Sequence, residues 1–137
     1  MKKFLVVIFL LAFVLTIAAS AVSAMEKVPN LVGHWHGKSM MHFKKDGFKK
    51  AKEPLKFIVK KQEGRVFTGT KIWISNGKEM SENFSGVVAI TNKKIYIAEH
   101  EDGLVIGDIV SKNKIVIYYI EDGENSKVII TELDRVK

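Results

Sequence analysis

The stretch KIYIAEHEDGLVIGDIVSKNKIVIYYIEDG, residues 94–123, decides the fold class. It contains three short segments rich in Ile, Val and Tyr, and polar residues with Asp-Gly or Lys-Asn separate them. Asp-Gly supplies the positive φ angles that tight hairpins need, and β-branched and aromatic residues favour strands. The stretch therefore predicts three consecutive antiparallel strands joined by hairpins.

The same pattern continues towards both ends of the chain. Turn signals recur at Gln62-Glu63-Gly64, Ser75-Asn76-Gly77 and Asp122-Gly123, and no segment after the N-terminal region has a helical period. We expect an all-β domain with eight strands. Their ranges are Leu31–Met41, Leu55–Lys61, Arg65–Ile74, Met80–Ala89, Lys94–His100, Leu104–Val110, Lys114–Glu121 and Lys127–Asp134.

Eight hairpin-linked strands favour an antiparallel up-and-down β-barrel. An open sheet of this kind leaves two unpaired edges, and closure removes both. A β-sandwich is the alternative, although it usually needs longer crossing connections. The one long connection that we expect is Phe43–Pro54, FKKDGFKKAKEP, which carries five lysines.

The N-terminal segment has the pattern of a secretory signal peptide over residues 1–24. Lys2 and Lys3 precede an apolar run, which ends in the small residues of Ala21–Ala24. We expect cleavage after Ala24 and a single secreted or extracytoplasmic domain over residues 25–137. An uncleaved N-terminal membrane anchor is the alternative, because the apolar stretch is long enough to span a bilayer. The chain has no cysteine, so it contains no disulfide.

Charge is distributed unevenly along the chain. Lys27–Lys78 contains 13 basic and 3 acidic residues, whereas Glu79–Lys137 contains 7 basic and 11 acidic residues. This asymmetry indicates either a polarised surface that steers anionic partners or simply solvated strand faces. The lysine-rich loop Lys44–Lys52 is either a surface contact or a solvated loop. We expect no nucleic-acid partner.

The first strand contains a short motif, Gly33-His34-Trp35. This G-x-W resembles the start of calycin barrels, the lipocalins, fatty-acid-binding proteins and avidins. In those families the Trp plugs the closed end of the barrel, and a basic residue near the last strand packs over it. The resemblance implies that Gly33, Trp35 and Arg135 form such a plug. Phe67-Thr-Gly-Thr-Lys71 also resembles an avidin strand, but Gly37 and Lys71 replace the avidin Asn and Tyr.

The resemblance also implies a ligand cavity inside the barrel. With avidin-like inward parity it is lined by Trp35, Ser39, Met41, Phe67, Lys71 and Trp73. An unpaired buried ammonium on Lys71 is costly, so the expected ligand is a small apolar or anionic amphipathic molecule. The alternative is that Lys71 points outward and that the barrel is filled by its own side chains.

Other chemistry has weaker support in the sequence. His34 and His36 share one face of the first strand, which suits a metal site only with a further ligand from a neighbouring strand. The repeated Glu-Asp-Gly at 101–103 and 121–123 is typical of acidic hairpin turns. There is no cysteine nucleophile and no G-x-S-x-G motif. We therefore expect no metal, no cofactor and no enzymatic activity.

Two later strands, Lys94–His100 and Lys114–Glu121, are apolar on both faces. Lys114–Glu121 carries Ile115, Ile117 and Tyr119 on one face and Val116, Tyr118 and Ile120 on the other. A strand with one solvated face alternates apolar and polar residues, so these strands favour a homo-oligomer. The sequence thus leaves two functional classes. The first is an exported binding module, and the second is a non-enzymatic structural or interaction protein that acts through self-association or its lysine-rich loop.

Overall fold

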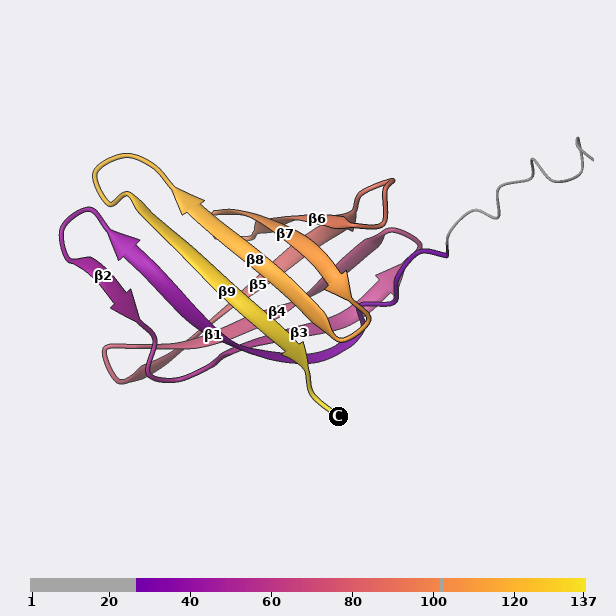
Figure 1. Cartoon of the computed structure of the whole chain (residues 1–137), viewed down its shortest axis with the longest axis horizontal. Helices are drawn as coiled ribbons and strands as arrows, with labels where there is room; N and C mark the ends of the chain where they lie inside the picture. The colour runs from indigo at the N-terminus through magenta and orange to yellow at the C-terminus, as the bar shows by residue number, and fades with distance from the viewer. Residues whose placement is uncertain (1–26, 102) are drawn as a thin grey trace, which may run out of the picture.

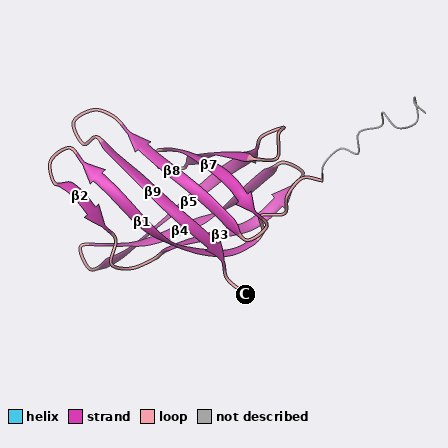
Figure 2. Cartoon of the chain, in the orientation of Figure 1, coloured by secondary structure: helices cyan, strands magenta, loops and turns pink. Residues whose placement is uncertain are grey.

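The computed structural model describes residues 27–101 and 103–137, so the predicted signal peptide at 1–24 lies outside the described residues. Figure 1 shows the described chain as strands joined by short loops, and Figure 2 shows that this part contains no helix. It accordingly has no helix that is long and apolar enough to cross a membrane. The strands are β1 Gly33–Phe43, β2 Gly47–Lys50, β3 Leu55–Glu63, β4 Val66–Ser75, β5 Lys78–Val88, β6 Lys94–Glu99, β7 Leu104–Ser111, β8 Lys114–Glu121 and β9 Lys127–Arg135.

Eight of these strands form a closed antiparallel barrel, which confirms the predicted fold class. Each of β3 to β9 pairs with its neighbour in sequence, and β1 pairs with both β3 and β9. The closing pair is long, because nine residues from Trp35 to Phe43 lie opposite residues of β9. The strands β8, β9 and β1 therefore lie side by side in Figure 1.

The short strand β2 corrects the prediction of an unstructured connection between Phe43 and Pro54. β1 is longer than its pairing with β3, which ends at Gly37 opposite Leu55. Beyond that point the same edge of β1 is free, and β2 pairs with it from Met40 to Phe43. The lysines of β2 do not reveal that it is a strand, because lysine is common on exposed edge strands as well as in loops.

The turns between the strands lie at the two ends of the barrel. The β4–β5 hairpin turns at Asn76 and Gly77, both with positive φ (50° and 75°), as a type I′ turn requires. This turn lies at the same end as the β8–β9 connection, and we call it the open end. Residues 27–32, the C-terminus and the turns after β3, β5 and β7 lie at the opposite, closed end.

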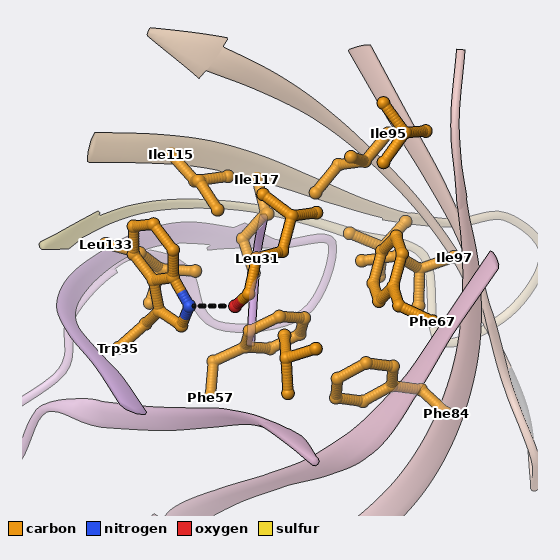
Figure 3. Packing of buried hydrophobic residues seen from close by; sticks show 13 residues of the cluster. Leu31, Trp35, Phe57, Phe67, Phe84, Ile95, Ile97, Ile115, Ile117 and Leu133 are labelled. Carbon is orange, nitrogen blue, oxygen red and sulfur yellow. Dashed lines mark hydrogen bonds between the residues drawn. The ribbon is translucent and has the colours of Figure 1, made fainter. Parts of the chain in front are cut away.

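The half of the barrel near the closed end is filled by a hydrophobic core, part of which is drawn in Figure 3. Phe57 stacks on Phe84 with ring centroids 4.3 Å apart, and Phe67 meets Phe84 edge to face. Glycine makes room for these rings, because a Cβ on Gly69 would lie 2.6 Å from the Phe84 ring. The buried hydrophobic residues are Leu31, Trp35, Phe57, Val59, Phe67, Phe84, Val88, Ile95, Ile97, Val105, Ile115, Ile117 and Leu133.

Candidate ligand-binding cup

Above the core, the open half of the barrel contains a cavity of about 480 Å³ that we call the cup. Its side chains come from every barrel strand and from the segment between β2 and β3. Most of its apolar and aromatic lining residues come from β1, β4, β8 and β9. The lining residues are Ser39, Met41, Phe43, Ala51, Glu53, Leu55, Lys71, Trp73, Ile74, Ser75, Glu82, Glu99, Val105, Ile117, Tyr119, Glu121, Lys127, Ile129 and Thr131.

Three charged side chains from adjacent strands meet in the cup, and we call them the Lys71 cluster: Lys71, Glu82 and Glu99. The Lys71 ammonium forms an ion pair with Glu99, and its Nζ lies 3.4 Å from Glu82 Oε2. The exposed fractions of the side chains are 15% for Lys71, 8% for Glu82 and 4% for Glu99. Because the two carboxylates are almost fully buried, this is an interior ion cluster rather than a surface salt bridge.

Burial raises the pKa of the Glu99 carboxyl, because it penalises the charged form. The hydrogen bond and the positive charge of Lys71 act in the opposite direction, and the neighbouring Glu82 adds to the increase. Glu82 itself accepts a hydrogen bond from the backbone N–H of Glu101, at 2.9 Å. The backbone thus holds the Glu82 carboxylate in place, whereas burial disfavours the charged form of Glu99.

Aromatic rings surround the ammonium. Lys71 Nζ lies 4.8 Å from the centroid of the Trp73 ring and 5.3 Å from that of the Tyr119 ring. Both contacts are within the range in which a cation is attracted to the face of a ring. The site therefore combines two carboxylates with two aromatic rings around one cation.

A second ion pair lines the cup at the ends of β8 and β9 that meet at the open end. Lys127 Nζ lies 2.6 Å from Glu121 Oε2, and the hydroxyl of Tyr119 donates to the same oxygen at 2.8 Å. The hydrogen bond from Lys127, followed by that from Tyr119, lowers the pKa of Glu121. Between the paired strands β1 and β9 the hydroxyls of Ser39 and Thr131 hydrogen bond to each other at 2.7 Å. These contacts pair the polar groups of the wall with one another and leave the apolar lining for a ligand.

The structure separates the six predicted cavity residues into two groups. Four of them, Ser39, Met41, Lys71 and Trp73, line the cup. Trp35 and Phe67 do not, because they lie one layer deeper in the filled core, with 0% and 2% of their surface exposed. The inward parity is the expected one along both strands, but the core occupies the lower half of the barrel.

Sequence reasoning missed most of the residues that line the cup, among them the three that contact Lys71, which are Glu82, Glu99 and Tyr119. A signal was present for Glu99, which shares the parity of Ile95 and Ile97, both buried. A carboxylate at the end of an apolar face indicates a buried partner, and Lys71 at an inward position needed one. Lys71 lies directly opposite Glu82 in the β4–β5 pair and Glu99 lies on the next strand, so these contacts depend on the register of consecutive strands.

The closed end has the arrangement that the G-x-W resemblance implies. The guanidinium of Arg135 lies 4.1 Å from the Trp35 ring centroid and donates to the carbonyls of Asn30 and Val32, at 2.8 Å each. Trp35 Nε1 donates to the carbonyl of Leu31 at 3.0 Å, drawn as the dashed line in Figure 3. Gly33 has φ of 136°, and a Cβ there would lie 3.0 Å from Arg135 Nη1. These contacts close the barrel bottom.

The histidines of β1 lie on the outer face of the barrel. His34 and His36 are exposed, and their parity is opposite to that of the buried Trp35. Across residues 27–101 and 103–137 no group of three His, Asp or Glu side chains is arranged to hold a metal ion.

Comparison with known proteins supports the fold. No protein-family model matches the chain, and no curated protein matches it. Among solved structures, a redesigned beta barrel is similar, with a TM-score of 0.56 and 17% sequence identity. The match covers 78% of this chain and 92% of that chain. At this identity the likeness concerns the barrel fold alone.

Proposed function

We propose that the protein is a non-enzymatic binding module that holds a small apolar or amphipathic molecule in the cup. The observation that carries the proposal is the contrast between the filled closed half and the hollow open half of one barrel. The cup volume of about 480 Å³ lies within the range of small-molecule sites, and its lining is largely apolar with a few convergent polar groups.

The ion pairs of the cup change the expected ligand chemistry. An anionic ligand was expected because Lys71 needed a partner. Glu99 and Glu82 already supply that partner, which removes the reason for expecting an anion. The apolar or amphipathic character of the ligand then rests on the apolar lining of the cup, which includes Met41, Phe43, Trp73 and Ile129.

The place of action is part of the proposal. The signal-peptide pattern of residues 1–24 supports action outside the cytoplasm. The residues that precede β1 join the barrel at its closed end, next to Trp35 and Arg135. The mouth of the cup therefore lies at the end of the barrel opposite residues 27–32.

Native mass spectrometry tests the proposal directly. Protein purified without refolding is expected to carry a small organic molecule that is released on denaturation. Titration with octan-1-ol then measures whether the cup accepts an apolar chain. Met41→Trp fills the cup and is expected to abolish binding. Met40→Trp is the matched control, because Met40 is the adjacent residue and points outward with 54% of its surface exposed.

A binding curve that is unchanged in Met41→Trp contradicts the proposal, because the alcohol then binds elsewhere. Absence of any binding by the wild-type protein contradicts it as well.

A second candidate function, self-association, is favoured by the outer face of β1, β7, β8 and β9. Met40 lies opposite Ile130, which lies opposite Tyr118. A parallel row contains Val128, Ile120 and Leu104, with 52%, 55% and 56% of their surfaces exposed. These rows form one apolar surface that continues into a groove beside Phe48 of β2.

Sedimentation velocity tests this candidate. A homo-oligomer through the apolar face is expected to dissociate in Ile130→Lys, because a charge at the centre of the interface is costly to bury. Ile90→Lys is the control, since Ile90 is equally apolar and lies in the β5–β6 loop. A monomeric wild-type protein at micromolar concentration rules this candidate out.

A further inference from the structure

The most exposed large apolar side chain of residues 27–101 and 103–137 belongs to β2, the short strand that lies outside the ring of eight barrel strands. Phe48 has 90% of its surface exposed, and its ring meets the His42 ring edge to face with centroids 4.6 Å apart. β2 pairs with β1 over four residues, and the backbone N–H of Ala51, just beyond it, donates to the carbonyl of Ser39 at 3.0 Å. A regular strand therefore holds this ring in water, where burial against a partner would be favourable.

Positive charge surrounds the ring. The segment 44–52, which we call the β2 segment, has one acidic residue, Asp46, and this residue pairs with Lys49 at 2.8 Å. The lysines of the β2 segment, all exposed, are Lys44, Lys45, Lys49, Lys50 and Lys52. Glu53, which follows the segment, lines the cup. An exposed aromatic ring set among several ammonium groups is complementary to a surface that is apolar within and anionic at its face.

The β2 segment adjoins an apolar outer face of the barrel that carries no acidic residue. Phe48 begins one row of outward side chains, which continues through His42, Val128, Ile120 and Leu104. Lys50 begins the parallel row, which continues through Met40, Ile130, Tyr118 and Ile106. Acidic side chains first occur in the row beyond, at Glu132 and Asp108, and in the β8–β9 connection, outside both rows. The face is thus apolar with a basic edge.

We propose that the β2 segment and this apolar face bind the surface of a lipid bilayer that contains anionic lipids. Phe48 and its apolar neighbours enter the boundary between head groups and acyl chains, and the lysines contact the anionic head groups. An isologous contact with a second copy of the chain would bring a second set of the same lysines to the interface, whereas lipid phosphates supply the opposite charge.

The proposal goes beyond the proposed function, because it does not depend on whether the cup holds a ligand. It also places membrane contact on the folded domain, whereas the sequence indicated it for the N-terminal segment alone. β2 lies at the open end of the barrel (Figure 1), and Phe43 and Ala51 on either side of it line the cup. A bound bilayer would therefore lie beside the mouth of the cup.

Co-sedimentation with vesicles tests the proposal. The full chain, as the expression host processes it, is mixed with vesicles of phosphatidylcholine or of phosphatidylcholine and phosphatidylglycerol in equal parts. The affinity for the mixed vesicles is expected to be about tenfold higher or more, since each lysine near an anionic surface contributes about 1 kcal/mol. Added salt is expected to reduce this difference, because it screens exposed charges.

Phe48→Ser tests the apolar contact. The affinity for mixed vesicles is expected to fall by about tenfold or more, because one large apolar side chain no longer enters the bilayer. The side chain is almost fully exposed in the free protein, so its removal should leave the barrel folded. Ile90→Ser is the matched control, because Ile90 is 79% exposed and lies in the β5–β6 loop at the closed end; it is expected to leave binding unchanged.

A triple variant tests the electrostatic contact. Loss of three lysines of the β2 segment is expected to reduce the affinity for mixed vesicles by about a hundredfold and to change binding to phosphatidylcholine little. The control loses three exposed lysines nearer the closed end, with the same change in net charge, and is expected to bind like the wild type. The test variant is Lys44→Gln, Lys45→Gln and Lys50→Gln, and the control is Lys60→Gln, Lys93→Gln and Lys112→Gln.

Three results would overturn the inference. The first is a wild-type protein that binds neither kind of vesicle; if that protein is a homo-oligomer in sedimentation velocity, the apolar face belongs to a second copy of the chain. The second is binding of equal strength to both kinds of vesicle. The third is binding that neither test variant weakens more than its control does, because attachment then does not use the β2 segment. These results leave the proposed function standing, since octan-1-ol binding tests the cup separately.

Discussion

The two halves of the barrel are built from the same strands and differ only in what their inward positions carry. Towards the closed end these positions hold Trp35, Phe67 and Phe84, all almost fully buried, and the interior is filled. Towards the open end the same strands β4 and β5 carry Lys71 and Glu82, and the interior is hollow. Burial of large apolar side chains stabilises a fold, whereas buried ions contribute little net stability. The closed half therefore supplies most of the stability of the fold, and the open half is free for binding.

Replacing each of the two tryptophans in turn is expected to give the largest difference in unfolding free energy between the two halves. Trp35→Ala removes a fully buried side chain and should lower the free energy of unfolding by about 3–5 kcal/mol. Trp73→Ala removes a partly exposed side chain and should cost less than about 2 kcal/mol. Urea denaturation measures both, and equal losses would remove the distinction between the halves.

The plug at the closed end is expected to have an intermediate effect. Arg135→Met removes the contact with the Trp35 ring and three hydrogen bonds to backbone carbonyls. A loss of about 2 kcal/mol is expected in the free energy of unfolding. Lys137→Met controls for the loss of a positive charge two residues away. If the two variants are equally stable, Arg135 does not hold the end of the barrel closed.

The Lys71 cluster should appear as a smaller, pH-dependent effect. The pKa of Glu99 is higher in the folded than in the unfolded chain, so the native state binds the proton more tightly. Its contribution to stability therefore decreases as pH rises from about 4.5 through the folded pKa. Glu99→Gln removes this dependence. The melting temperature of the variant relative to wild type should rise as the pH increases above about 4.5, and a constant difference would argue against a buried carboxyl with a raised pKa.

The sequence predicts the strands better than it predicts the cup. Asn76-Gly77 and Gly103 mark their turns locally, and alternation along β4 places Phe67 and Lys71 on the inward face. The pairing of β2 with β1 is not local, because it depends on where β3 leaves the edge of β1. The partners of Lys71 also come from the next two strands, 11 and 28 residues further along the chain, and the register of the β4–β5 and β5–β6 pairs brings them together.

Depth along the barrel axis was the other unpredictable quantity. Inward parity assigns Trp35 and Ser39 to the same interior, yet one is in the core and the other lines the cup. Which layer is filled depends on side-chain volumes contributed by all eight strands, such as the Phe84 ring that occupies the space next to Gly69. The residue pattern of a single strand therefore does not predict which layer of the barrel is filled.

The chain contains only two tryptophans, one in each half, and this allows a single measurement of the central claim. Incorporation of 5-fluorotryptophan gives two fluorine NMR resonances, which Trp73→Phe assigns. On titration with octan-1-ol the resonance of Trp73 in the cup is predicted to shift, while that of Trp35 in the closed core stays in place. A shift of Trp35 as large as that of Trp73, or no shift of Trp73 while the alcohol binds, would contradict the division of the barrel into a stabilising half and a binding half.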